Sequence, residues 1–215
     1  MLARLREKSS NRTVLIFGGI KGFVRDGNDL KTQLEEAKPD LILISISQEQ
    51  VKGLREFLKN PFEMNLSDYE VMYGVHLSLY GEVMTPPPIY VETLQYADRY
   101  NIEVKGLDMS EDEYQELYTG NMKTFDVVRH SVRKRRLLKK DFRASTPEGF
   151  VDAWTKNINR VKGLRKIDEA RLEYIRNDLL KELEKTTSSN IFVVLEYEFY
   201  KDILDYLKNN GYYES

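Results

Sequence analysis

Residues 13–22 read Thr-Val-Leu-Ile-Phe-Gly-Gly-Ile-Lys-Gly, a continuous apolar run followed at once by three glycines around a single lysine. A helix-like pattern over residues 28–38 and a second apolar run over 41–46 come next. A strand, a glycine turn, a helix and a strand in this order are typical of a parallel sheet, and they place the turn at the carboxyl edge of that sheet. Open α/β proteins bind their ligands at this edge. The stretch therefore predicts a fold class and the location of a site.

The rest of the chain extends the same pattern. Ser67 and Ser110 each have a glutamate three residues later, and this capping-box spacing predicts that a helix begins at each serine. Residues 1–12 are interpreted as a charged lead-in. We predict a single α/β domain over residues 1–215, with a small, mainly parallel sheet of about four strands covered by many helices. Further strands are expected at 102–107 and 191–195, and further helices at about 48–59, 89–99 and 199–208.

Residues 121–185 change character, because their apolar residues recur at helical spacings. They predict three helices that form an inserted or flanking helical layer. Thr146-Pro147 is an N-cap followed by proline at the first helical position, and Gly163 is expected to end the helix that begins there. The third helix is expected at about 166–184.

Composition narrows the classes of function. The 215 residues carry 33 Lys and Arg against 35 Asp and Glu, and the net charge of -2 argues against a protein that coats nucleic acid. The absence of cysteine excludes disulfides, thiolate metal sites and cysteine nucleophiles. No apolar run approaches the roughly 20 residues that span a bilayer, so we expect a cytoplasmic protein without a membrane partner. A charged fraction of 32% without cysteine is also typical of heat-adapted proteins.

The glycine turn is the first candidate binding element. Gly18 and Gly19 would let the backbone approach an anion, and Lys21 together with the first amides of the next helix would stabilise it. The turn matches neither the Walker A motif nor the G-x-G-x-x-G dinucleotide fingerprint. The alternative is a tight structural turn that carries a solvated lysine.

The segment 69–90 is dense in polar aromatic residues. Tyr73, His76 and Tyr80 would share one face of a helix, with Glu82 after the helix and Tyr90 beyond three prolines. Such side chains would suit a small polar pocket for a small-molecule ligand. The alternative is that His76 is a core histidine with its hydrogen bonds made, beside buried tyrosines.

Carboxylates follow two of the expected strands. Asp108 comes just after the third strand, and Glu196 and Glu198 come just after the fourth. At the carboxyl edge of a parallel sheet they would converge with Lys21, where they could hold a divalent cation through oxygen ligands or act as acid and base. Lys21, Asp108 and Glu198 are therefore the catalytic candidates, and no metal ligand is assigned. Ordinary cap and loop roles are the alternative.

A basic stretch is the second candidate surface. Arg129, Arg133, Arg136, Lys140 and Arg143 recur at spacings of four and three, which would place them in one stripe along a helix. The stripe could lie along the phosphates of nucleic acid or against an acidic partner. No nucleic-acid recognition motif accompanies it, so a solvated or ion-paired helix face is the alternative.

The order of the elements resembles the TraB/PrgY–Tiki superfamily, which includes the ChaN and erythromycin-esterase-like proteins. The shared order is a strand ending in Gly18-Gly19-Ile20-Lys21, a helix running into Lys38-Pro39-Asp40, an apolar strand, an aspartate after a later strand at Asp108, and a C-terminal strand leading into a final helix. The resemblance covers most of the chain and implies an α/β fold with its site at the sheet edge.

The resemblance also implies metal-dependent peptidase chemistry, but the chain departs from the family motifs at the positions concerned. Lys21 stands where the family pattern Gly-x-x-His has histidine, and Ser45 stands where a glutamate is usual. The family's Asp-Arg pair and its terminal Gly-His region read here Asp108-Met109 and Glu196-Tyr197-Glu198-Phe199. The resemblance therefore implies a diverged branch with a different site.

Two classes of function follow from these patterns. The first is a hydrolase-type enzyme that acts on a small polar or anionic substrate at the carboxyl edge of the sheet. The second is a non-catalytic binding or scaffold protein, which would use the basic stripe or assemble as a homo-oligomer. Binding that depends on Lys21 favours the first, and steeply salt-dependent binding favours the second.

Overall fold

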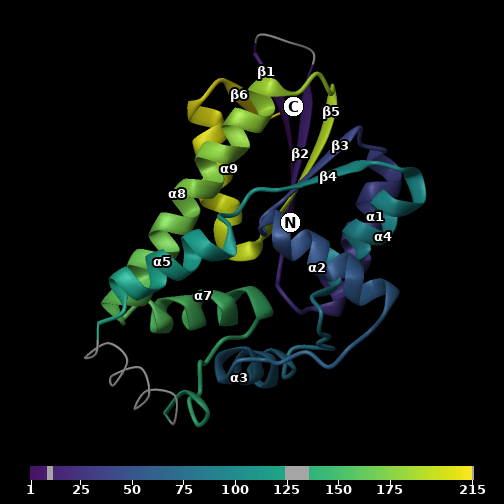
Figure 1. Ribbon diagram of the computed structural model, residues 1–215. Coiled ribbons are helices and arrows are strands. Elements are labelled where there is room, and N and C mark those ends of the chain that lie inside the picture. The colour runs from purple at the N-terminus through teal and green to yellow at the C-terminus, as the bar shows by residue number, and fades with distance from the viewer. Residues whose placement is uncertain (9–11, 124–135, 215) are drawn as a thin grey trace.

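The computed structural model describes residues 1–8, 12–123 and 136–214, and they form an α/β fold in which helices cover both faces of one sheet (Figure 1). The strands are β1 (Leu2–Glu7), β2 (Thr13–Gly19), β3 (Leu41–Ile44), β4 (Glu103–Gly106), β5 (Asn190–Glu196) and β6 (Tyr212–Glu214). The described helices are α1 (Val24–Ala37), α2 (Gln48–Lys59), α3 (Asp68–Leu77), α4 (Pro88–Tyr100), α5 (Glu111–Asn121), α7 (Pro147–Ile158), α8 (Lys162–Lys185) and α9 (Tyr197–Asn209).

The sheet has six strands in the order β4-β3-β5-β2-β1-β6 and is mixed. The four predicted strands, β2 to β5, run parallel, whereas β1 is antiparallel to β2 and β6 is antiparallel to β1. The expectation of about four strands was therefore too low. The interpretation of residues 1–12 as a lead-in was also wrong, because β1 lies within them and pairs with β2 along its length.

Apolar residues at alternate positions of the parallel strands belong to two hydrophobic cores, one on each face of the sheet. Ile16 and Val193 face a core shared with α8 and α9, whereas Phe17 and Val194 face a core shared with α1, α2 and α4. Strands buried on both faces are apolar without alternation, which is why β2, β3 and β5 are recognisable in the sequence.

A third apolar cluster lies beyond the carboxyl ends of the parallel strands. It joins α3 and α7 to the glycine turn, with Phe150 and Trp154 of α7 packed against Ile20 and Phe23. Figure 1 shows α3 and α7 lying across this end of the sheet. The cluster therefore lies beside the edge of the sheet at which the sequence predicts a binding site.

The predicted helical layer over residues 121–185 is correct in part. Thr146 caps α7 as expected, since its hydroxyl accepts a hydrogen bond from the Gly149 amide at 3.1 Å. Gly163 does not end a helix but lies in the first turn of α8, where a Cβ atom would meet Met122 Sδ at 2.7 Å. Residues 138–146 are not helical. Among the described residues, no helix is both long and apolar enough to cross a membrane.

Candidate functional site

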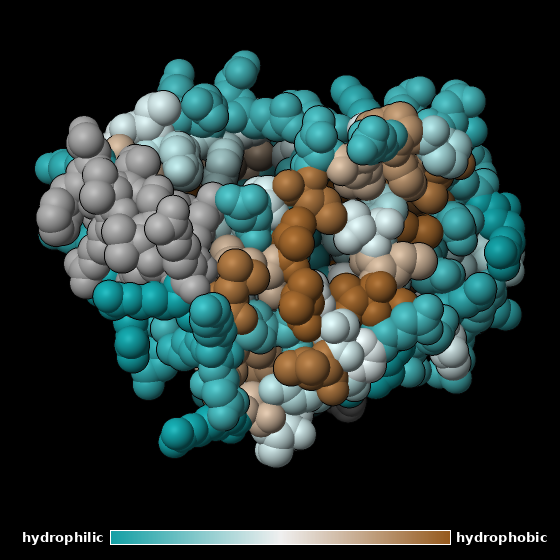
Figure 2. Space-filling model, turned by 90° about the horizontal axis from the view of Figure 1, so that it is seen from below, coloured by the Kyte–Doolittle hydropathy of each residue, from teal (hydrophilic) through white to brown (hydrophobic). Residues whose placement is uncertain are grey.

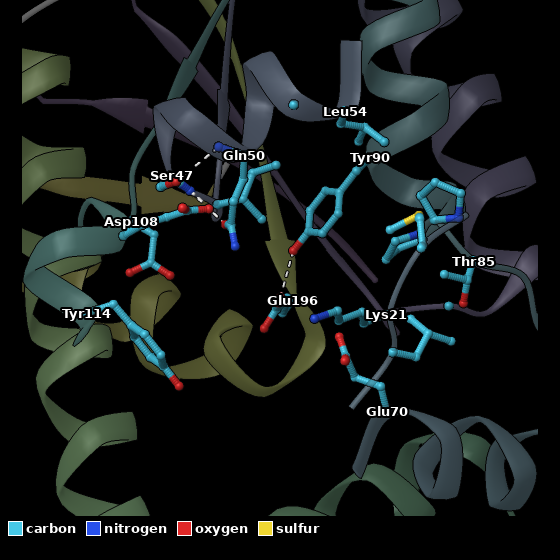
Figure 3. Close-up of a pocket in the computed structure, with 18 of the residues that line it drawn as sticks. Lys21, Ser47, Gln50, Leu54, Glu70, Thr85, Tyr90, Asp108, Tyr114 and Glu196 are labelled. Atoms are coloured by element: carbon cyan, nitrogen blue, oxygen red, sulfur yellow. Dashed lines mark hydrogen bonds between the residues drawn. The ribbon is translucent and has the colours of Figure 1, made fainter. Parts of the chain in front are cut away.

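The loops that follow the four parallel strands open into one cavity of about 880 Å³ (Figure 3). Lys21 follows β2, Ser47 follows β3, Asp108 follows β4, and Glu196 and Glu198 lie at and just beyond the end of β5. Helices α2 and α3 and the segment between them complete the wall. The three catalytic candidates proposed from the sequence thus line a single cavity.

The glycine turn directs the Lys21 side chain into the cavity, but it does not form an anion cradle. The Ile20 amide donates to the buried Asp26 carboxylate at 2.6 Å, and the Val24 amide at the start of α1 donates to the Glu82 carbonyl at 3.1 Å. Because these amides already have acceptors, they are not available to a bound phosphate. In Figure 3 the Lys21 ammonium lies between the carboxylates of Glu196 and Glu70.

Gly18 and Gly19 are needed for packing rather than for contact with a ligand. A Cβ atom on Gly18 would lie 2.7 Å from Tyr200 Cβ, and one on Gly19 would lie 2.8 Å from Ile89 Cγ2. Neither glycine lines the cavity, whereas Gly22, with a φ of +87°, does. The sequence pattern located the turn but misassigned the role of its first two glycines.

The buried floor of the cavity is built around Glu196. The Tyr90 hydroxyl donates to Glu196 Oε1 at 2.8 Å, and the Glu196 amide donates to the buried Ser45 hydroxyl at 3.0 Å. Burial and then the Glu196 carboxylate raise the pKa of Tyr90 well above its ordinary range. Tyr90 therefore stays a hydroxyl donor that fixes Glu196.

Glu198 is an acid of the site with a strongly raised pKa. Burial, and then the nearby charge of Glu196, raise its pKa to about 7, while Lys21 opposes the shift. Its Oε2 atom is buried and accepts no hydrogen bond from any residue that the structure describes. The Tyr73 hydroxyl is also buried without a described partner, and burial followed by Glu198 raises its pKa. A carboxyl with a pKa near neutrality can both accept and donate a proton at physiological pH.

Asp108 is held by an arginine that the sequence reasoning missed. Arg171 of α8 donates through Nε to Asp108 Oδ2 at 2.9 Å and lies against the Phe199 ring. Burial raises the pKa of Asp108, although Arg171 opposes the shift. Burial alone would lower the pKa of Arg171, but Glu196 and Asp108 outweigh it and raise the pKa. Because Asp108 is committed to this ion pair, it is a positioning group rather than a free base.

The aromatic segment contributes only in part to the cavity. Tyr73 and Tyr90 line it, but His76, Tyr80 and Glu82 do not. His76 Nε2 lies 2.9 Å from the Leu137 carbonyl oxygen, and the Tyr80 hydroxyl donates to the Ala144 carbonyl at 2.9 Å. Both rings pack in the third apolar cluster against aromatic residues of α7 and its neighbours. His76 is thus a half-buried histidine packed among aromatic rings outside the cavity, which favours the structural alternative.

The described part of the basic stretch does not form the expected stripe. Arg129 and Arg133 lie outside the described residues. Lys140 and Arg143 are not in a helix, and the Lys140 ammonium donates to Asn157 Oδ1 at 2.7 Å. Arg136 and Arg143 are exposed, and Arg143 lies 3.9 Å from an Asp141 carboxylate oxygen. The internal partner of Lys140 and the non-helical backbone at Lys140 and Arg143 weaken the nucleic-acid interpretation.

The acids of the cavity do not fit a metal centre. Within residues 1–8, 12–123 and 136–214, no three His, Cys, Asp or Glu side chains gather in a way that could hold a metal ion. Asp108 is also occupied by Arg171, and Glu196 accepts from Tyr90. Metal-dependent chemistry, implied by the family resemblance, has no ligand set among these side chains.

Comparison with known proteins gives the chain no family. No family model matches it, and no curated protein matches it. The resemblance to the TraB/PrgY–Tiki superfamily therefore stays a prediction. What the cavity can do chemically follows from its own side chains.

Proposed function

We propose that the cavity is the active site of a hydrolase-type enzyme that acts on a small polar substrate without a metal ion. One observation carries the proposal: the Glu198 carboxyl, whose pKa is about 7, has a buried oxygen without a described partner in a cavity that also holds the Lys21 ammonium. Strongly shifted acids in cavities are typical of catalytic sites.

Each group has a distinct role in the proposed reaction. Glu198 accepts a proton from the attacking water as the new C–O bond forms at the carbonyl carbon. The bond between that carbon and the leaving oxygen or nitrogen then breaks, and Glu198 returns the proton to the leaving group. The Lys21 ammonium lines the same cavity, where its positive charge stabilises the negative oxygen that develops in the transition state. Tyr90 and Arg171 position Glu196 and Asp108 around the reacting groups.

The charge of the lining narrows the substrate. Six described carboxylates, those of Glu49, Glu70, Asp108, Glu111, Glu196 and Glu198, face two cations, Lys21 and Arg171. A lining with this excess of negative charge attracts cationic molecules, admits neutral ones and repels anions. Of the polar or anionic substrates expected from the sequence, we therefore propose the uncharged or cationic ones.

A panel of chromogenic esters and anilides tests the proposal. We expect kcat/KM to rise with pH and to level off above a pKa near 7, and we expect Glu198→Gln to lower it by roughly a hundredfold or more. Glu173→Gln, which removes an exposed glutamate of α8, is the matched control and should leave the rate unchanged.

Hydrolysis that is equally fast in wild-type protein and in Glu198→Gln would exclude the proposed role. If no panel member is hydrolysed while the protein binds nucleic acid with a steep salt dependence, the non-catalytic binding protein becomes the better interpretation. Family membership is a separate proposal: the predicted strand and helix order that carries the TraB/PrgY–Tiki resemblance recurs in the fold, with β2, β3, β4 and β5 in the expected sequence positions.

A further inference from the structure

One wall of the cavity is apolar and remains exposed. The segment between α2 and α3 has no regular secondary structure, and Phe62, Met64 and Leu66 alternate along it. All three line the cavity, yet their exposed fractions are 60%, 39% and 41%. Side chains two residues apart in extended chain point to the same side. The segment therefore presents an apolar surface to the cavity rather than to a core.

Neighbouring helices enlarge this apolar surface. Leu54 and Phe57 of α2 also line the cavity, and the Phe57 ring meets the Phe62 ring edge-on with centroids 5.4 Å apart. Viewed from the α3 side, apolar side chains gather in a band across the molecule (Figure 2). Apolar surface that is left exposed beside a polar floor marks a ligand groove more often than a solvent face.

Another part of the cavity lining is polar and holds two buried polar atoms without a described partner. Glu198 Oε2 and the Tyr73 hydroxyl are buried there without a described partner, and both can accept hydrogen bonds. Buried polar atoms that lack a partner cost free energy, which a ligand with several N–H donors would recover. The excess of carboxylates in the lining favours a positive charge on that ligand.

We propose that the cavity binds an amphiphilic amine, with its ammonium group at the acidic floor beside Glu198 and its apolar body along Phe62, Met64 and Leu66. As a statement about the substrate, this inference rests on the proposed hydrolase function. As a statement about binding, it can be tested without any catalytic step.

Tryptophan fluorescence offers a direct measurement, because Trp154 is the one tryptophan of the chain and lines the cavity. The probes are butylamine, hexylamine and octylamine, compared with butanoate, hexanoate and octanoate at the same ionic strength. We expect the amines to change the Trp154 emission in a saturable way, with affinity rising by up to about fourfold for each buried methylene. The carboxylates should bind at least tenfold more weakly than the amines, on the order expected for one unfavourable charge contact.

A variant tests where the apolar end of the ligand binds, and the pH dependence of binding tests where its ammonium group binds. Met64→Ser should weaken octylamine binding by roughly fivefold to tenfold, because one apolar contact is lost. Met84→Ser is the matched control, since Met84 is 43% exposed, close to Met64, but does not line the cavity. Between pH 6 and pH 8 octylamine binding should tighten as Glu198 ionises, because an alkylammonium group stays protonated throughout this range.

Three outcomes would overturn the inference: octanoate binding as tightly as octylamine, affinity that does not change with chain length, or equal effects of Met64→Ser and Met84→Ser. Failure of the proposed function looks different. In that case octylamine binds as expected, but Glu198→Gln leaves every hydrolysis rate in the ester and anilide panel unchanged.

Discussion

Replacing Glu198 with glutamine should change how the stability of the protein depends on pH. Glutamine has nearly the same shape as glutamic acid but cannot ionise. The wild-type protein should therefore lose stability as the pH rises through neutrality, whereas Glu198→Gln should not lose this part of its stability.

The magnitude follows from two pKa values. The carboxyl of Glu198 has an ordinary pKa of 4.5, and burial followed by the charge of Glu196 raises it to about 7 in the folded protein. Because the folded state holds the proton more tightly, the stabilisation is complete below pH 4.5 and is lost as the pH rises through 7. Through this one group, the folded protein becomes about 3 kcal/mol less stable at pH 8.5 than at pH 4.

Urea unfolding followed by circular dichroism, at half-unit steps from pH 4 to pH 8.5, measures the effect. The free energy of unfolding of the wild-type protein is subtracted from that of Glu198→Gln at each pH, so that contributions of groups that do not interact with Glu198 cancel. The difference should grow by about 3 kcal/mol across the range, with its steepest rise between pH 5 and pH 7. Glu173→Gln in α8 provides the control, since its side chain is exposed.

A flat difference, changing by less than about 1 kcal/mol, would refute the reasoning. It would mean that the Glu198 carboxylate is as well solvated or hydrogen-bonded when folded as in the unfolded chain. A difference that grows toward low pH would be a stronger contradiction, because it would show that the folded state lowers the pKa of Glu198.

Other substitutions test neighbouring parts of the site and its support. Lys21→Met should raise the pKa of Glu198 further, since Lys21 opposes the shift, and carboxyl NMR titration measures this. Tyr90→Phe should lower the free energy of unfolding in urea by about 1–3 kcal/mol, because the buried Glu196 carboxylate loses the hydroxyl that donates to it at 2.8 Å. An unchanged urea midpoint would contradict this, since it would show that water replaces the hydroxyl. Gly18→Ala should cost about 1–3 kcal/mol, because the new methyl group would lie 2.7 Å from an aromatic side chain, and a shift of the melting temperature below 1 °C would contradict that packing.

The parallel strands could be predicted because burial on both faces removes polar residues from them, as in Leu41–Ile44. The strand β1 was missed because only Leu5 is fully buried in it. Arg4 and Arg6 are exposed, so the sequence of this strand resembles that of a charged terminal segment. The capping boxes at Ser67 and Ser110 are confirmed, because such caps depend on local geometry that a four-residue pattern specifies.

The position of the site followed from topology, but its composition did not. Lys21, Asp108 and Glu198 could be brought together because each follows a parallel strand. Arg171 lies in the middle of α8, and the spacing of residues along a helix does not indicate that one of its side chains reaches the edge of the sheet. A signal was nevertheless present, since Arg171 lies four residues from both Ile167 and Ile175, on the buried stripe of that helix. An arginine on such a stripe needs a buried acid.

The place of β5 in the sheet has a consequence for the order of folding. β5 is nearly the last strand in the chain but lies between β3 and β2, so the β1–β2 pair and the β3–β4 pair are not joined into one sheet until residues 190–196 arrive. A chain emerging from the ribosome must keep Leu41–Ile44 and Thr13–Gly19 from pairing with other chains during this delay. The same strand carries Glu196 and leads into Glu198. The step that joins the sheet is therefore also the step that brings Glu196 and Glu198 to the cavity, so a partly folded chain lacks the carboxyl group to which the proposed reaction is assigned.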